Sequence, residues 1–463
     1  MSFVLNLPVY FLFAIILYKI CKGNEASKFY ALALGTLLFP SVGTFIAKPT
    51  IAPHHAFIYT YLIIEFLQSI GKHKTNFKRI LYIPLLLIIA STTATILHTE
   101  GLNLKTFYVA ARDFFESYGY LIAAFIAGIK TPGYEIFDKF YKVIIAICVF
   151  AVIEVLIEYN IPYTFICSAY PNYDMAFTTL EKGGTFIDSW RIRAAVTTVH
   201  PTALGTLLCT IFAFYLPLWK KNIISQKKLC LTLAALIAGM AVCGSRTAMI
   251  CAALAFAIFL VSRVNIYLKI LIIGAIIFSF GTVITLTINH FEYSKGSSLD
   301  LRKEQLIFSV LAIQQSPIYG NGVQYTSKYI FEASDDGNSK GTAKGLHDEN
   351  LGGLESIIFR KVIDYGFLGL GCFFAFLLFF QFYFFINRNK SLYARSGALA
   401  TLTFTLFLIL SGTLANSIVY GYTFIGFCLA RTRKAKVLGY DEDSEENAES
   451  KDSTKKQPCE TQD

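Results

Sequence analysis

Stretches of about 20 mostly apolar residues recur along almost the whole chain, and this pattern constrains the fold more than any other feature. A helix of that length crosses the hydrocarbon core of a bilayer, where every backbone polar group must be satisfied within the protein. The sequence therefore predicts an all-α, polytopic transmembrane helical bundle of about 12–13 spans. These predicted spans lie near residues 3–20, 29–47, 53–70, 80–97, 106–129, 140–159, 196–218, 229–244, 247–262, 266–288, 357–386, 396–413 and 415–431.

The low content of charged residues also indicates a membrane protein. Charged residues make up 16% of the 463-residue chain, whereas a soluble domain usually carries about 25%. The net charge of +10 predicts no nucleic-acid partner, because Lys and Arg gather in the cytoplasmic connectors of membrane proteins. The ten cysteines are scattered without metal-ligand spacing, so we interpret them as small core residues.

Basic residues occur in alternate connectors, and they orient the predicted spans. By the positive-inside rule these connectors are cytoplasmic, so the loops 160–195 and 289–356 are predicted to face outward. The basic residues concerned are Lys19, Lys22 and Lys28; Lys72, Lys74, Lys78 and Arg79; Lys130, Lys139 and Lys142; Lys220, Lys221, Lys227 and Lys228; Arg263 and Lys269; Arg388, Lys390 and Arg395; and Arg431, Arg433, Lys434 and Lys436.

The hydrophobic pattern and the topology together divide the chain into three parts. Residues 1–185 form N-terminal transmembrane helices, and residues 186–433 form a second transmembrane domain that includes the outer loop 289–356. Within this loop, apolar and polar residues alternate at helical spacing over 301–316 and Pro317 follows, which predicts a short surface helix. Residues 434–463 are polar and charged, and we expect a disordered cytoplasmic tail.

Three arginines that are distant in the sequence are predicted to lie at one depth, at the outer membrane boundary. Arg193 precedes the seventh span, Arg246 lies in a hairpin between two spans, and Arg302, with Lys303 beside it, begins the loop helix. A planar, permanently charged guanidinium binds phosphate oxygens in a bidentate fork. The set predicts an anion site, although each arginine alone is equally consistent with snorkelling or with pairing at a helix end.

Other polar residues near this boundary are candidates for proton transfer or for binding. His347 and Glu355 are the candidate bases, and the alternative for Glu355 is a helix N-terminal carboxylate favoured by the macrodipole. His200, before Pro201, is more typical of a helix start than of a base. Arg112, in the fifth span, lies near Asp113 and Glu116, and is expected either to face the same site or to pair with a carboxylate between helices. No acidic pair predicts a metal site, and no cofactor is expected.

Four signatures resemble the bacterial O-antigen ligase and O-antigen polymerase family. They are RAAVTTVHPTALG, GSRTA, LRKEQLIFSVLAIQQSPIYGNG and VIDYGFLGLGCFF, and they occur in the family's order over roughly residues 186–431. The matching positions are Arg193, Arg246, Arg302, Pro317, Gly320, Gly322 and Gly366. The chain departs from the ligase pattern at one position, because Glu355 and Ser356 stand where ligases place a histidine, often followed by asparagine.

The resemblance implies a metal-independent glycosyltransferase of the bacterial cytoplasmic membrane, with its site facing the periplasm. Its donor would be an undecaprenyl-diphosphate-linked glycan, and Arg193, Arg246 and Arg302 would bind the diphosphate. A ligase would transfer the glycan to a saccharide such as the lipid A core, with Glu355 or His347 as the acceptor base. A polymerase would instead join two carrier-linked repeat units, and the departure at Glu355 leaves this alternative open.

Two other classes of protein remain as alternatives from the sequence alone. A secondary transporter or lipid-glycan flippase would concentrate ionisable residues near the bilayer midplane on broken helices. A non-catalytic scaffold of an export complex would leave the three arginines without a common task. The predicted position of the arginines beside a long outer loop favours an enzyme.

Overall fold

The structure, a computed structural model, describes residues 2–39, 52–69, 79–99, 101, 103–170, 193–198, 200–220, 224–261, 307, 309–326, 357–410 and 415–438. Within these ranges every long element is a helix and no strand occurs. The elements are α1 (Ser2–Lys22), α2 (Glu25–Leu38), α3 (Pro53–Ser69), α4 (Arg79–Thr99), α5 (Leu104–Lys130), α6 (Gly133–Ile157), α7 (Ile161–Cys167), α8 (Pro201–Tyr215), the 3-10 helix η2 (Leu216–Lys220), α9 (Gln226–Cys243), α10 (Arg246–Val261), α14 (Ile357–Asn387), α15 (Leu392–Leu410) and α16 (Ala415–Leu438).

The helices confirm the predicted all-α transmembrane bundle. Twelve of the thirteen predicted spans coincide with a helix, and the remaining one, 266–288, lies outside the described residues. Six of the described helices are long and apolar enough to cross a membrane. The predicted loop helix 301–316 is helical over its continuously described part, 309–315, and ends before Pro317. The short helix α7, inside the predicted outer loop 160–195, was not predicted.

Local sequence explains where several helices begin. Asn24 accepts a hydrogen bond from the backbone N–H of Ser27 at the start of α2, and Asn103 accepts one from Lys105 at the start of α5. Side-chain oxygens at this position satisfy backbone donors that the helix leaves unpaired. Pro201 occupies the first turn of α8, where its missing N–H costs nothing.

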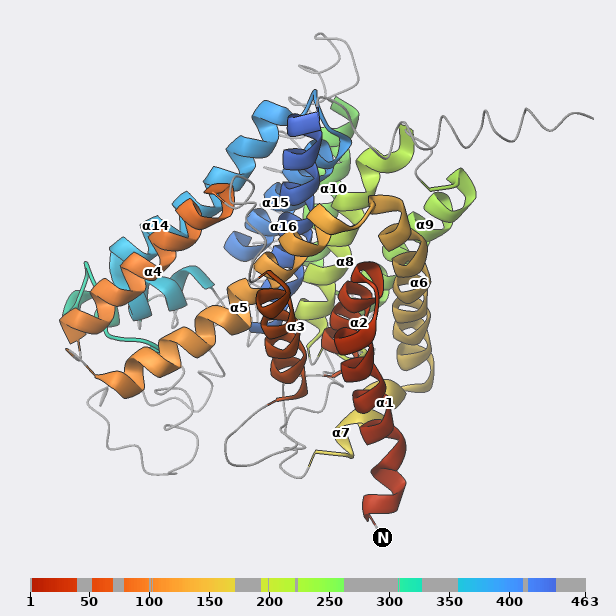
Figure 1. Cartoon of the computed structure of the whole chain (residues 1–463), viewed down its shortest axis with the longest axis horizontal. Coiled ribbons are helices and arrows are strands. Elements are labelled where there is room, and N and C mark those ends of the chain that lie inside the picture. Colours follow the sequence, from red (N-terminus) through yellow and green to blue (C-terminus); the bar gives the residue numbers. More distant parts are fainter. Residues whose placement is uncertain are drawn as a thin grey trace, which may run out of the picture.

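The centre of the bundle is the close packing of α5 against α16 (Figure 1). A Cβ on Gly426 would lie 2.3 Å from the carbonyl oxygen of Leu121, and one on Gly128 would lie 2.8 Å from Cβ of Ala430. Small residues allow transmembrane helix backbones to approach this closely. Because α5 belongs to residues 1–185 and α16 to the second half, the two halves of the chain share one core.

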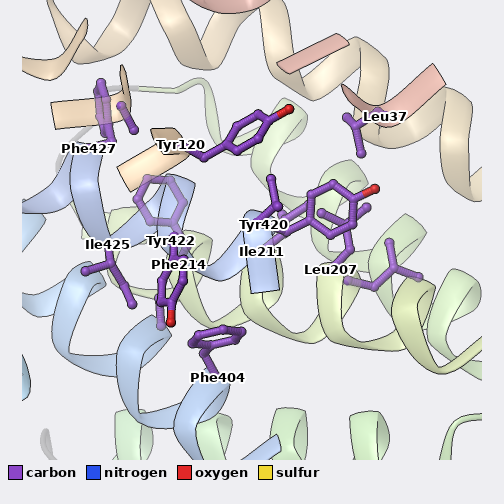
Figure 2. Close-up of a cluster of buried hydrophobic side chains, with 14 of the residues drawn as sticks. Leu37, Tyr120, Leu207, Ile211, Phe214, Phe404, Tyr420, Tyr422, Ile425 and Phe427 are labelled. Carbon is purple, nitrogen blue, oxygen red and sulfur yellow. The ribbon is translucent and has the colours of Figure 1, made fainter. Parts of the chain in front are cut away.

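Aromatic and aliphatic side chains fill the space beside this helix pair. Tyr120 of α5 and Tyr420 of α16 lie near Leu37 of α2 and Leu207 of α8 (Figure 2). Tyr118, Phe376 and Tyr422 form a ring cluster with centroids 5.1–5.7 Å apart. Large buried side chains from the first and second halves of the chain therefore interdigitate, and they fix the relative positions of the helices that carry the polar residues described below.

An ion-pair network fixes the ends of α2, α3 and α5 that adjoin basic connectors. Nζ of Lys130 lies 3.3 Å from a carboxylate oxygen of Glu25 and also pairs with Glu65, and Nζ of Lys28 lies 3.3 Å from Glu25 and 3.8 Å from Glu65. Lys28 and Glu65 are both buried. Two cations and two carboxylates thus balance each other, as burial of charge requires.

Candidate functional site

The segment 193–198, which carries Arg193, is held by the buried carboxylate of Glu154 in α6. The backbone N–H of Ala195 donates to this carboxylate at 3.2 Å, and that of Val196 donates at 2.7 Å. Nδ2 of Asn160 donates to the same carboxylate at 2.9 Å. Val196 has φ +51°, an unfavourable conformation for a β-branched residue. The carboxylate therefore stabilises a turn that the local sequence alone would not favour.

The same segment packs on the hairpin between α9 and α10. The N–H of Ala194 donates to the carbonyl of Val242 at 3.2 Å, and Nε of Arg193 donates to the carbonyl of Cys243 at 3.3 Å. Gly244, in the left-handed conformation, ends α9, and Arg246 begins α10 directly after Ser245. The structure therefore brings the segments that carry Arg193 and Arg246 together, although about 50 residues separate them in the sequence.

A backbone lock joins the segment after the loop helix to the first half of α14. The N–H of Asn321 donates to the carbonyl of Ile363 at 2.8 Å, and that of Gly322 donates to Asp364 at 3.2 Å. In the opposite direction, Phe367 donates to Pro317 at 2.8 Å and Leu368 to Ile318 at 3.1 Å. The lock comprises residues 317–322 and 363–368, which belong to the third and fourth sequence signatures.

Two glycines make the lock possible. Gly320 has φ +78° and Gly366 has φ +66°, a region that side chains rarely adopt. A Cβ on Gly320 would lie 2.4 Å from the carbonyl oxygen of Asp364, and a Cβ on Gly366 would lie 2.2 Å from that of Ile318. Gly366 also interrupts the helical backbone of α14. Both positions therefore require glycine for conformation and for space.

A polar cavity of about 370 Å³ lies beside the lock. Helices α3, α4, α5, α14 and α16 line it, together with Gln324 and Thr326 from the segment after the loop helix. Its volume is in the range of about 300–1,000 Å³ that is typical of small-molecule sites. Its acidic, basic and histidine side chains are those of His54, His55, Arg112, Asp113, Glu116, Arg360, Lys361 and Asp364.

Glu116 is the centre of one group of contacts in the polar cavity. Its Oε1 lies 3.2 Å from Nδ1 of His55 and 3.4 Å from Nε of Arg112, and it accepts a hydrogen bond from the hydroxyl of Tyr59 at 3.5 Å. The adjacent Asp113 lies 3.4 Å from Nη2 of Arg112 and accepts a hydrogen bond from Nε2 of Gln324. Arg112 therefore lines the polar cavity and pairs with two carboxylates of its own helix, so these ion pairs do not join two helices.

The cavity is formed by the helix ends that lie away from the basic connectors. His54 and His55 are at the start of α3, Arg112 is near the start of α5, and Lys361 is near the start of α14. The opposite ends of α3 and α5 carry Glu65 and Lys130 of the ion-pair network. All the polar groups of the cavity thus belong to one side of the bundle, the side opposite the basic connectors.

The predicted site residues fall into two groups. Arg193, Arg246, Arg112 and His200 are described, whereas Arg302, Lys303, His347 and Glu355 lie outside the described residues. His200 precedes α8, and its Nδ1 accepts a hydrogen bond from the N–H of Thr202 at 3.1 Å, the expected arrangement for a helix-start histidine.

Sequence reasoning missed Glu154, His55 and Asp364. Glu154 and Asp364 are buried acidic residues in predicted spans, and acidic residues at such positions are usually functional or paired. His55 gives a weaker signal in the sequence. That signal is its position at the start of a predicted span, beside a second histidine, His54.

The fold and the polar residues define an all-α, multi-pass membrane protein with a polar cavity on one side of the bundle. No family model and no curated protein matches the chain. The resemblance to the ligase and polymerase family therefore depends on the four sequence signatures alone.

Proposed function

We propose that the chain is an O-antigen ligase-like glycosyltransferase of the bacterial cytoplasmic membrane. It would move a glycan from an undecaprenyl-diphosphate carrier to a saccharide acceptor, such as the lipid A core, on the outer face. The single observation that carries the proposal is the docking of the Arg193 segment on the α9–α10 hairpin that presents Arg246. Two guanidinium groups from distant parts of the chain belong to one structural unit at the predicted outer boundary.

The chemistry of the transfer explains why arginine suits this position. The acceptor oxygen attacks the anomeric carbon, the bond from that carbon to the phosphate oxygen breaks, and the carrier diphosphate leaves with the electron pair. The proton of the acceptor hydroxyl passes to a base, for which Glu355 and His347 are the candidates. Fixed guanidinium groups stabilise the charge that develops on the diphosphate, and in a low-dielectric site this effect is large.

The backbone lock provides a second line of support. Its two segments, 317–322 and 363–368, belong to the third and fourth signatures of the family resemblance. Gly320 and Gly366 are required for the contact between them. The lock fixes the segment after the loop helix on α14, beside the polar cavity. A rigid support of this kind is what a loop-borne catalytic group needs in order to reach a reproducible position.

The proposal is tested with the purified protein in lipid nanodiscs, a carrier-linked glycan and an acceptor oligosaccharide. The wild type should release the carrier diphosphate and form the glycosylated acceptor. Arg193→Ala and Arg246→Ala should each lower kcat by about 10²–10³-fold, the usual cost of losing one oxyanion-stabilising group. The matched control is Arg395→Ala, an exposed arginine at the start of α15, which should retain full activity.

Three results would contradict the proposal. If Arg193→Ala and Arg246→Ala both reacted at the wild-type rate, these arginines would not form a diphosphate site. Joining of repeat units without the acceptor would identify a polymerase. Movement of the carrier-linked glycan across the bilayer, with no release of carrier diphosphate, would identify a flippase or transporter.

A further inference from the structure

We propose that the polar cavity binds the acceptor saccharide through direct hydrogen bonds, in which its carboxylates accept from sugar hydroxyls, its guanidinium groups donate to them, and its histidines bind them through ring nitrogens. The inference rests on the proposed function for the identity of the ligand as an acceptor. It assigns a substrate class to residues of α3, α5 and α14 that lie outside the arginine segments.

The balance of charge in the cavity favours a polyhydroxylated ligand over an anion. Three cationic side chains, Arg112, Arg360 and Lys361, line the cavity together with three carboxylates, Asp113, Glu116 and Asp364. The carboxylates accept hydrogen bonds and the cations donate them, whereas a sugar hydroxyl does both. A diphosphate would meet as many negative as positive groups here, while a saccharide finds partners in both sets.

Aromatic rings of the cavity provide the apolar surface that a saccharide also needs. Phe114 and Tyr365 line the cavity, and Nζ of Lys361 lies 4.6 Å from the ring centroid of Tyr365. A mostly apolar wall with a few directed polar groups is typical of sites for small organic ligands. The combination of rings, carboxylates and cations fits the alternating polar edges and apolar faces of a sugar.

One buried polar atom of the cavity has no partner among the described residues. His54 is 7% exposed, it lines the cavity, and its Nδ1 makes no hydrogen bond within the part of the chain that the structure describes. A buried polar atom without a partner has lost its hydrogen bonds to water and gained none in the protein, which destabilises the empty site. A hydroxyl of a bound saccharide would satisfy this atom, and it would do so without introducing a net charge.

A short series of contacts connects the cavity to the Arg193 segment. The hydroxyl of Tyr120 donates to the carbonyl of His54 at 3.3 Å and accepts from the hydroxyl of Thr36 at 2.9 Å. The next residue of α2, Leu37, accepts a hydrogen bond from the hydroxyl of Thr197, in the segment that carries Arg193. Helix α2 therefore contacts the Arg193 segment directly and the cavity residue His54 through Tyr120. An oligosaccharide acceptor has several sugars, so one of them can occupy the cavity while another reacts.

Direct binding to the purified protein tests the inference independently of catalysis. The probe is core oligosaccharide released by mild acid from lipopolysaccharide, titrated into the protein in detergent by isothermal calorimetry. The wild type should bind it, and Glu116→Gln and Asp113→Asn should each weaken binding at least tenfold. Glu158→Gln, which changes an exposed carboxylate beyond the end of α6, is the matched control. Thermal unfolding of each variant shows whether the fold is kept.

Each outcome distinguishes the cavity from the proposed function. Binding that is lost only in the cavity variants supports the saccharide site, even if no glycan transfer is found with any donor. Equal binding in all variants, or no binding by the wild type, overturns it. Displacement of the oligosaccharide by inorganic phosphate at equal concentration also overturns it, because the cations would then recognise phosphate. If transfer does occur, the acceptor KM of Glu116→Gln should rise about tenfold, with less than a twofold change in the donor KM.

Discussion

Thr326 donates two hydrogen bonds to the carboxylate of Asp364, from its backbone N–H to Oδ1 at 2.8 Å and from its hydroxyl to Oδ2 at 3.1 Å. Both residues are buried, and they lie 38 positions apart in the sequence. The pair extends the backbone lock by one further contact. It fixes the point at which the chain leaves the lock, within the predicted outer loop 289–356.

Removal of the Asp364 carboxylate should destabilise the protein. Asp364→Ala leaves the buried N–H of Thr326 without an acceptor, so we expect a loss of about 1.5–3 kcal/mol, the usual contribution of a hydrogen bond to a charged group. Asp364→Asn should lose less, because its amide oxygen still accepts the backbone N–H. Thermal unfolding in detergent measures the effect, and an Asp364→Ala variant as stable as the wild type would contradict it.

The glycines of the lock should be intolerant of alanine. Gly320→Ala and Gly366→Ala each place a Cβ within 2.4 Å of a carbonyl oxygen in a left-handed backbone conformation. The conformation costs about 1–2 kcal/mol and the overpacking about 1–3 kcal/mol. Gly371→Ala is the control, because Gly371 lies in α14 like Gly366 and a Cβ there meets nothing within 4 Å. Similar melting temperatures for all three variants would show that the lock does not stabilise the fold.

Most of the helices could be predicted because apolar runs of membrane length are a strong local signal. The lock could not be predicted in the same way. Its partners, such as Asn321 and Ile363, lie 42 positions apart, and no periodicity within either segment specifies the other. The interruption of α14 at Gly366 was not predicted either, because the predicted span 357–386 runs through this position as one segment.

The candidate site was predicted less completely than the fold. The basic connectors predicted Arg193 and Arg246 at one boundary, and the structure adds the hairpin contact that joins their segments. The buried Glu154 gives no distinctive signal in the sequence, where it is one carboxylate near the end of a predicted span. Its role depends on the turn at Val196, which only the tertiary structure reveals. Arg302, outside the described residues, remains a sequence prediction.

Glu154 should act as a positioning residue for Arg193. In Glu154→Gln, the amide NH₂ replaces one of the oxygens that accept the backbone N–H groups of Ala195 and Val196. The turn should loosen, and the donor KM should rise about tenfold while the acceptor KM changes little. The matched control is Glu158→Gln, one turn further along the chain and exposed. Equal increases in both KM values would indicate a general loss of structure instead.

The pH dependence of stability should contain a contribution from Glu25, at the start of α2. Burial raises the pKa of this carboxyl, but attraction by Lys130 and Lys28 outweighs the burial and holds the pKa below its ordinary value of 4.5. A depressed carboxylate pKa stabilises the folded state above the unfolded pKa, and this contribution is lost as the pH falls through the folded pKa. The wild type should therefore lose stability below about pH 4.5.

Comparison of the wild type with Glu25→Gln isolates this contribution from that of Glu65 and the two lysines of the same network. Melting temperatures measured from pH 7 to pH 3.5 should differ most at pH 7, where the wild type is more stable, and converge as the pH falls. Glu135→Gln, a carboxylate in the first turn of α6, controls for the interaction with the helix macrodipole. A difference between wild type and Glu25→Gln that stays constant with pH would show that the ion pairs of Glu25 contribute nothing to folding.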